Sequence, residues 1–424
     1  MQDDRFRRFG VLGGGLFFTI TGLAGQFFAL YAQELGASTL TIGLLVTLRA
    51  VLPIFIAMPS GQLIDTIGPM KMLVVGNACL LTSLVLNATA SSLVSLILSQ
   101  FFLGSSIIIM ASSFQVLVST GDQAIRNEYI QRYSMWMSGG GMLGPLIGGL
   151  VASLFPVPMD GYRAAFMAAA LSSAGLMVAL VWMGRSYAHP KPEEADLDLR
   201  SMISPAGVLK SYKKGIDLTR HRPVQFGLTA TFLIMYIQSL YNGFLPLYMD
   251  SVGFTTLIIS TALAMNGLSA MLTRYVLGGL MNRMAPEHIL TVAGFTAAAC
   301  VAVTPLAGQH VVPMLLVVTV MGGAVGVNLP VSIMVMVDAV GEGERGKLMG
   351  LRLLANRFAQ ILSPALFGLL GHALGLSAAL AGGGIFLLGV MTGFSAYANR
   401  TKAARTPAAG AERTEAVAPG PGPA

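Results

Sequence analysis

The sequence predicts an all-α membrane protein with 12 transmembrane helices in two pseudo-symmetric six-helix bundles. Three observations predict this fold: 54% of the 424 residues are hydrophobic and only 11% are charged, the apolar residues form long continuous runs, and the second half of the chain echoes the first. Each membrane-spanning helix needs ~20 predominantly apolar residues. Continuous runs favour helices, because the strands of a membrane barrel alternate apolar and polar residues in shorter segments.

Twelve apolar runs are long enough to span a bilayer. The 50 glycines do not argue against helices here, because small residues let neighbouring membrane helices approach closely. In chain order the expected helices cover residues 10–33, 41–60, 72–90, 93–119, 135–155, 162–183, 224–248, 255–280, 288–306, 312–337, 349–373 and 377–398.

A polar connector divides these runs into two sets of six. We therefore expect an N-terminal bundle over residues 1–185, a linker over 186–222 and a C-terminal bundle over 223–398. The linker segment 208–218 fits either an amphipathic helix on the membrane surface or a plain solvated connection. The tail over 399–424 is rich in Ala, Pro and Gly, a composition typical of disorder.

The two halves match at constant offsets. A shift of 217 residues superimposes the first helix on the seventh, and a shift of 219 superimposes the fifth on the eleventh. Consistent offsets at several positions indicate a duplicated six-helix unit. The superimposed pairs include Tyr31 with Tyr248, Gly36 with Gly253, Arg126 with Arg345, Pro145 with Pro364 and Gly149 with Gly368.

The positions of lysine and arginine predict the orientation. On one side of the expected helices lie 21 of the 26 basic residues, and the connections on the other side hold only Arg163. Basic loops stay cytoplasmic, so both termini are expected inside the cell. The compact loops and the absence of a targeting signal favour a bacterial inner membrane. The net charge of +7 is therefore a topology signal, and no nucleic-acid partner is expected.

The connection between the second and third helices resembles motif A of the major facilitator superfamily, and the resemblance extends over nearly the whole chain. The matching residues are Gly61, Asp65, Gly68 and Lys71, whereas Thr66 and Pro69 stand where basic residues are usual. Arg283 occupies the second-half counterpart of Thr66. The resemblance implies a conformational latch in which Asp65 faces the positive start of the eleventh helix. Alternatively, Asp65 only caps a tight turn.

The fifth helix resembles the antiporter motif of exporters in this superfamily. Its glycines flatten one helix face and its proline permits a bend, which favours close, bendable packing and export. The packing residues are Gly140, Gly144, Pro145, Gly148 and Gly149. The fourth helix resembles motif B, but Gln100 stands where an arginine implicated in proton coupling is expected, so the coupling mechanism stays open.

Two arginines lie deep in apolar runs. Arg49 precedes Gly61 by twelve residues, which places it ~18 Å above the inner end of its helix at 1.5 Å per residue. Arg357 is similarly deep. A charge at that depth costs ~2.5–3.5 kcal/mol or more on insertion scales, so it is expected to face a cavity and to mark a substrate pathway. The alternative is a structural arginine satisfied by Asn356 or Gln360.

Other polar and aromatic residues fall on helices expected to line a central cavity. With the two arginines, the cavity candidates are Gln26, Arg49, Gln115, Tyr236, Gln238, Tyr241, Asn242, Asn266, Asn328, Asn356 and Arg357. Residues expected in gates or ion pairs near the cytoplasmic ends are Asp122, Arg126, Asp338, Arg345 and Arg352; Arg274 is expected to snorkel or to pair there. The histidines and cysteines predict neither a metal site nor a cofactor.

These features predict a secondary active transporter that moves a small organic molecule by alternating access. No Walker A pattern is present, so the driving energy is expected from a gradient. The preferred interpretation is a proton-coupled efflux antiporter that works as a monomer in the lipid bilayer. One alternative is an organic-anion transporter that uses Arg49 and Arg357, and another is a transporter-like scaffold or sensor. An enzyme is not expected, because no nucleophile and base pair can be identified.

Overall fold

The computed structural model of the chain describes residues 2–120, 122–187, 217–337, 339–340 and 345–403. Throughout these residues the secondary structure is helical. Twelve helical stretches within them are long and apolar enough to cross a membrane. The predicted fold class is confirmed.

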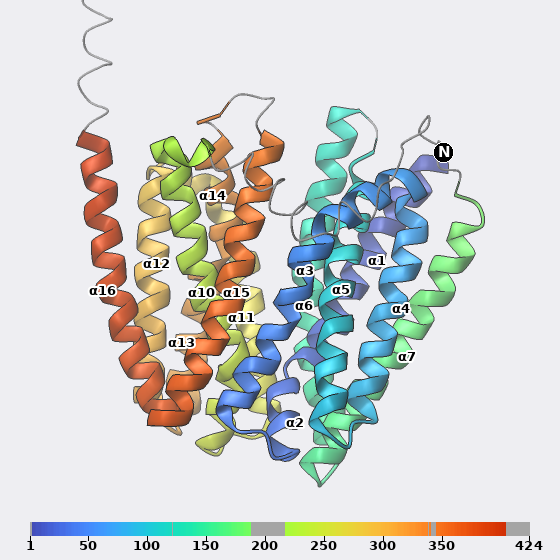
Figure 1. Cartoon of the computed structure of the whole chain (residues 1–424), viewed down its shortest axis with the longest axis horizontal. Coiled ribbons are helices and arrows are strands. Elements are labelled where there is room, and N and C mark those ends of the chain that lie inside the picture. Colours follow the sequence, from blue (N-terminus) through green and yellow to red (C-terminus); the bar gives the residue numbers. More distant parts are fainter. Residues whose placement is uncertain (1, 121, 188–216, 338, 341–344, 404–424) are drawn as a thin grey trace, which may run out of the picture.

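The helices form two groups that lie side by side (Figure 1). The first contains α1 (Gln2–Gly25), α2 (Phe28–Glu34), α3 (Thr39–Ile67), α4 (Pro69–Ala88), α5 (Leu93–Val118), α6 (Gln123–Ser153) and α7 (Pro158–Gly184). The second contains η1 (Asp217–Arg220), α10 (Arg222–Ser251), α11 (Thr256–Met281), α12 (Pro286–Val303), η2 (Thr304–Ala307), α13 (Val311–Gly326), α14 (Asn328–Val337), α15 (Arg345–Leu374) and α16 (Leu376–Ala403). The start of α1 and the end of α16 lie at one end of the molecule, which we call the termini face; the other end is the far face.

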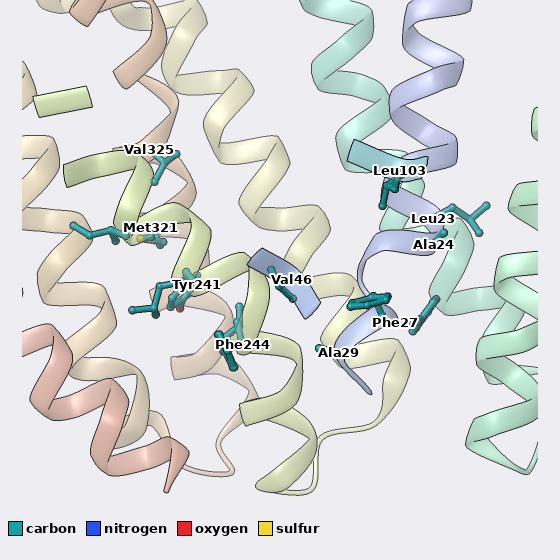
Figure 2. Packing of buried hydrophobic residues seen from close by; sticks show 14 of the residues in the cluster. Leu23, Ala24, Phe27, Ala29, Val46, Leu103, Tyr241, Phe244, Met321 and Val325 are labelled. Carbon is teal, nitrogen blue, oxygen red and sulfur yellow. The ribbon is translucent and has the colours of Figure 1, made fainter. Parts of the chain in front are cut away.

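Buried apolar side chains from both groups form the core. Figure 2 shows Phe27 of the first group and Phe244 of the second on either side of Val46, which belongs to α3. These residues have almost no exposed surface, with Phe27 and Phe244 at 0%. The core therefore continues across the boundary between the two groups.

Two expected helices are interrupted. The run predicted as 10–33 consists of α1 and α2, because the chain turns at residues 26 and 27, where the amide of Phe27 donates to the carbonyl of Ala24 at 3.2 Å. The run predicted as 312–337 consists of α13 and α14. Hydropathy does not reveal either break, because the residues on both sides of it are apolar.

The predicted loop 61–71 is wrong in its extent, because α3 continues to Ile67 and only Gly68 separates it from α4. Gly68 has a φ of +97°, a conformation that glycine adopts without the steric penalty of a Cβ. Its amide donates to the carbonyl of Ile64 at 3.0 Å, and Pro69 then begins α4, where a missing amide proton costs nothing. Gly61 and Asp65 are therefore helical.

α6 begins at Gln123, twelve residues before the expected start. Polar residues in this first part are compatible with a helix because they pair along it: Arg132 bonds Glu128 one turn away at 2.5 Å. The hydroxyl of Tyr129 also donates to the carboxylate of Asp4 on α1. The extra turns therefore fasten α6 to α1 at the termini face.

The predicted pseudo-symmetry is visible in the backbone. Gly36 and Gly253 superimpose under the 217-residue shift and have φ values of +86° and +94°. Each lies three residues before a helix, at Thr39 for α3 and Thr256 for α11. The turn that precedes the second helix of each six-helix unit therefore has the same backbone conformation in both halves.

The proposed domain boundaries stay a prediction. Most of the possible surface helix 208–218 lies outside the described residues; its last member, Leu218, is buried with Val224, Met336 and Leu348. α16 continues to Ala403, beyond the predicted helix end at 398, and the tail after it lies outside the described residues.

Candidate transport cavity

Two helix pairs make the most extensive contacts between the halves: α3 packs on α15, and α6 packs on α11. Near the far face both contacts depend on small residues. A Cβ at Gly43 would lie 2.4 Å from the carbonyl oxygen of Pro364, and a Cβ at Gly149 would lie 2.3 Å from the Ser260 hydroxyl. Under the repeat shift Gly43 superimposes on Ser260. The two interfaces are therefore copies of one arrangement.

A central cavity of about 390 Å³ lies between α3 and α5 of the first half and α10 and α15 of the second. Its polar lining contains two guanidinium groups, three amides and a hydroxyl. None of the lining residues that the structure describes carries a carboxylate: Val46, Arg49, Ala50, Gly104, Ile107, Met235, Gln238, Ser239, Asn242, Gly243, Arg357 and Gln360.

The guanidinium of Arg357 is held on α15 by its neighbour one turn away. Its Nη1 donates to Oε1 of Gln360 at 2.7 Å, and Nε2 of Gln360 reaches the sulfur of Met235 at 3.4 Å. On the far-face side of the cavity, the hydroxyl of Thr47 donates to the carbonyl of Ile361 at 3.1 Å and connects α3 to α15. Arg357 is thus positioned by Gln360 on α15, which in turn contacts Met235 on α10. The contact between Thr47 and Ile361 closes the cavity next to it on the far-face side.

Arg49 has a fixed backbone and a side chain with few restraints. α5 packs against its main chain, since a Cβ at Gly104 would lie 2.3 Å from the Arg49 carbonyl oxygen. The half-buried Arg49 side chain makes no hydrogen bond with any residue that the structure describes. It lies ten residues after the start of α3, about 15 Å from the far-face end at 1.5 Å per residue.

A family profile described as the Major Facilitator Superfamily matches residues 10–310. The chain belongs to the major facilitator superfamily. It is therefore a secondary transporter and not an enzyme. Membership of this family implies that the protein lies in a membrane and that its substrate is a small molecule.

Solved structures are similar to this major facilitator in fold. A bacterial homolog of the human lysosomal transporter Spinster, inward-facing and unoccupied, has a TM-score of 0.75 at 12% identity, with 94% of this chain and 97% of that chain covered. The nucleoside transporter NupG has a TM-score of 0.75 at 13% identity, with 92% and 99% covered. A POT family transporter in complex with 5-aminolevulinic acid has 0.73 at 13%, with 93% and 95% covered. Among curated proteins no sequence matches significantly.

Four of the predicted cavity residues of this major facilitator line the cavity: Arg49, Gln238, Asn242 and Arg357. The cavity is also lined by Gln360, Ser239 and Met235, which the sequence analysis did not include among the cavity candidates. Each lies within three residues of a predicted cavity residue, Gln238 or Arg357, and this spacing could have identified them. Both halves contribute side chains, so the cavity exists only while α3 and α5 face α10 and α15.

The other cavity candidates lie elsewhere. Gln26 donates to the Pro145 carbonyl at 2.9 Å, the hydroxyl of Tyr241 is 3.1 Å from that of Thr304, and Asn266 donates to the Val318 carbonyl at 3.1 Å. These three hold helices together. Of the rest, Gln115 is exposed, Asn328 and Asn356 are buried, and Tyr236 borders an apolar pocket between α10, α15 and α16.

The helix-packing residues contact two neighbours. Cβ atoms at Gly140, Gly144 and Gly148 would lie 2.3, 2.5 and 2.4 Å from the α1 carbonyl oxygens of Gly15, Thr19 and Leu23. Pro145 lies between them inside α6 and packs against Gly22. Gly149 points across the boundary to α11. The motif therefore joins α6 to its own half over three glycines and to the other half at the fourth.

The gate and latch predictions are described only in part. Arg352 donates to the Ser332 hydroxyl from Nε at 3.3 Å and from Nη2 at 3.2 Å. Arg274 donates to the Gly326 carbonyl at 3.2 Å and across the halves to the Ser138 hydroxyl at 3.1 Å. Asp122, Arg126, Lys71 and Arg283 are exposed. The side chains of Asp65 and Arg345, and all of Asp338, lie outside the described residues.

Proposed function

We propose that this transporter carries a small organic anion, bound between Arg49 and Arg357. The observation that supports this most directly is the lining of the central cavity, whose described residues include two guanidinium groups and no carboxylate. A buried charge needs a compensating partner, and the planar fork of arginine matches a carboxylate or phosphate with two hydrogen bonds. Arg49 has no hydrogen-bond partner among the described residues, and a bound anion would supply one.

The remaining lining suits a small polar solute. Gln238, Asn242 and Gln360 offer both donors and acceptors, and Ser239 adds a hydroxyl. A volume of about 390 Å³ falls in the range of sites for small molecules. The arginines would therefore select a negatively charged substrate, and the amides would select one with matching hydrogen-bond donors and acceptors.

Alternating access follows from the placement of the contacts. The small-residue contacts of α3 with α15 and of α6 with α11 close the molecule on the far-face side of the cavity. If both termini lie in the cytoplasm, as their basic residues predict, these contacts support an inward-facing state of a monomer in an inner membrane. Transport then requires these contacts to separate while the termini-face ends of the halves approach.

Proton-coupled export is the second candidate. The glycine packing of α6 against α1 supports it, because this is the segment that resembles the antiporter motif of exporters. The described part of the cavity lining, however, offers no carboxylate as a proton carrier. For an anion, a membrane potential that is negative inside already favours exit by about 2.3 kcal/mol per charge at 100 mV.

Purified protein in liposomes tests these proposals. The panel contains monocarboxylates, dicarboxylates, organic phosphates and lipophilic cations, each under an imposed potential and separately under an imposed pH gradient. We expect anion flux that responds to potential and is lost in Arg357→Ala. Arg357→Lys is the matched control, because it keeps the charge and removes the fork.

Three results would contradict parts of the proposal. Flux of cations alone would exclude an anion carrier, and acceleration by a pH gradient at zero potential would favour proton coupling. If no compound in the panel moves, the chain is better described as a transporter-like scaffold or sensor.

A further inference from the structure

Arg49 borders two cavities. One is the transport cavity, and the other is a separate space of about 20 Å³ within the first half, lined by residues of α1, α3, α4 and α5 among others. Two amides, Asn87 of α4 and Gln100 of α5, line the smaller space together with Gly25 at the end of α1. A single side chain thus adjoins both the substrate space and a small polar space.

The two amide oxygens in the small space have unmet hydrogen-bonding capacity. Oε1 of Gln100 and Oδ1 of Asn87 are buried, with residue exposures of 0% and 3%, and neither oxygen has a hydrogen-bond partner in the part of the chain that the structure describes. The amide nitrogen of Gln100 donates to the Ser99 hydroxyl at 3.4 Å, so its oxygen remains directed elsewhere. Buried acceptors without donors are rare, because leaving them unmet is unfavourable.

Arg49 carries what these oxygens lack. A guanidinium has five N–H donors and no acceptor, and that of Arg49 donates to no residue in the described ranges. The residue with these donors and the two residues with the unmet acceptors therefore border the same 20 Å³ space. The space lies where the first helix is broken; Figure 2 shows Ala24 and Phe27 beside this break, and a Cβ added at Gly25 would meet nothing within 4 Å.

We propose that Asn87 and Gln100 form an amide berth that receives the Arg49 guanidinium when the carrier is empty. In the loaded carrier the guanidinium leaves the berth and binds the anion in the transport cavity. The berth lets an empty carrier close around its cavity with the Arg49 guanidinium hydrogen-bonded outside that cavity, so it favours the return step that net transport requires. The berth itself stands without the proposed anion function, whereas its role in the return step rests on that function.

A double-mutant cycle on the empty protein tests the berth without any substrate. The variants are Arg49→Met, Gln100→Met and the double variant, and the readout is the melting temperature of purified protein. If Arg49 donates to Gln100, the two losses are not additive, and the double variant melts at least about 2 °C above the sum of the single effects. The matched control pairs Arg49→Met with Gln238→Met, because Gln238 lines only the transport cavity.

Additive effects for Arg49 and Gln100 would overturn the berth. They are also the result expected if a fixed water molecule, for which 20 Å³ is sufficient, satisfies the two oxygens. Asn87→Leu provides a second cycle with Arg49→Met if the Gln100 variant does not fold.

A flux comparison tests the role of the berth in the return step. Gln100→Met is expected to lower net anion efflux at least tenfold and to leave anion exchange within twofold of the unmodified protein, since exchange never uses the empty carrier. Gly25→Ala is expected to give the same pattern, because its methyl group enters the small space and leaves both amides in place. Equal loss of net flux and exchange, or loss of neither, would overturn this role. If no anion moves at all, the proposed function fails and the melting cycle still decides on the berth.

Discussion

The two interfaces between the halves are built alike but hold different groups at their midpoints. Under the repeat shifts Arg49 of α3 superimposes on Asn266 of α11, and Arg357 of α15 superimposes on Ser138 of α6. In the α6 and α11 interface these positions are neutral and occupied: Asn266 donates to Val318, and Ser138 accepts from Arg274. In the α3 and α15 interface they are cationic and face the cavity.

The backbone packing behind these positions is the same. A Cβ at Gly104 would lie 2.3 Å from the carbonyl oxygen of Arg49, and a Cβ at Gly322 would lie 2.1 Å from that of Asn266. The comparison teaches that duplication supplies the scaffold, and that the candidate site arises where a few side chains depart from the symmetry.

The largest effect is expected from breaking the shared scaffold. Gly104→Val and Gly322→Val each force a side chain against a main-chain oxygen that cannot move away, so little folded protein should be recovered from either variant. Yield and elution as a single species on size exclusion measure this. Gly139→Ala is the control, since its Cβ meets nothing within 4 Å. Normal yield for either valine variant would mean that the packing on that side tolerates expansion.

The next effect separates the two midpoints by function. Arg357→Ala should reduce anion flux about 100-fold, because it removes a charged hydrogen bond to the substrate. Ser138→Ala, at the superimposed position, should change flux less than about twofold, because the lost partner of Arg274 is a single neutral hydroxyl. Initial rates in liposomes check both. Equal losses would mean that the site is shared between the interfaces.

Exchanging the groups tests stability. Asn266→Arg places a charge in the occupied interface and should lower stability by about 2.5–3.5 kcal/mol, as for a charge at the centre of a membrane helix. The reverse change, Arg49→Asn, removes only the hydrogen bonds that we assign to the guanidinium and should lower stability by no more than about 1 kcal/mol. Melting of purified protein measures both. A comparable loss in the two variants would show that Arg49 is a structural residue.

The smallest effect concerns the matching tyrosines of the two halves. The Tyr31 hydroxyl donates to the Ala90 carbonyl at 2.8 Å and accepts from Arg163 at 3.1 Å, whereas the Tyr248 hydroxyl donates to the Pro305 carbonyl at 3.4 Å. Tyr31→Phe should therefore destabilise the protein by about 1.5 kcal/mol and Tyr248→Phe by about 0.5 kcal/mol. Denaturation of the two variants side by side compares them, and a larger loss for Tyr248→Phe would reverse the ranking.

Sequence reasoning could reach the spans, the repeat and the two deep arginines, because hydropathy, constant offsets and the rarity of buried charge are local signals. It could not tell which polar residues face the cavity. Tyr241 and Asn242 are adjacent, yet one bonds Thr304 in the core and the other lines the cavity, because each residue turns the helix face by about 100°. The link from Arg274 to Ser138 likewise depends on how the halves meet.

The single residue between α3 and α4 has a mechanical consequence. Successive Cα atoms are about 3.8 Å apart, so the joint at Gly68 allows the two helix ends almost no separation. α3 can then swing about this point but cannot slide along its own axis without α4. Arg49 belongs to α3, so when α3 swings about Gly68 the arginine moves along an arc between the halves.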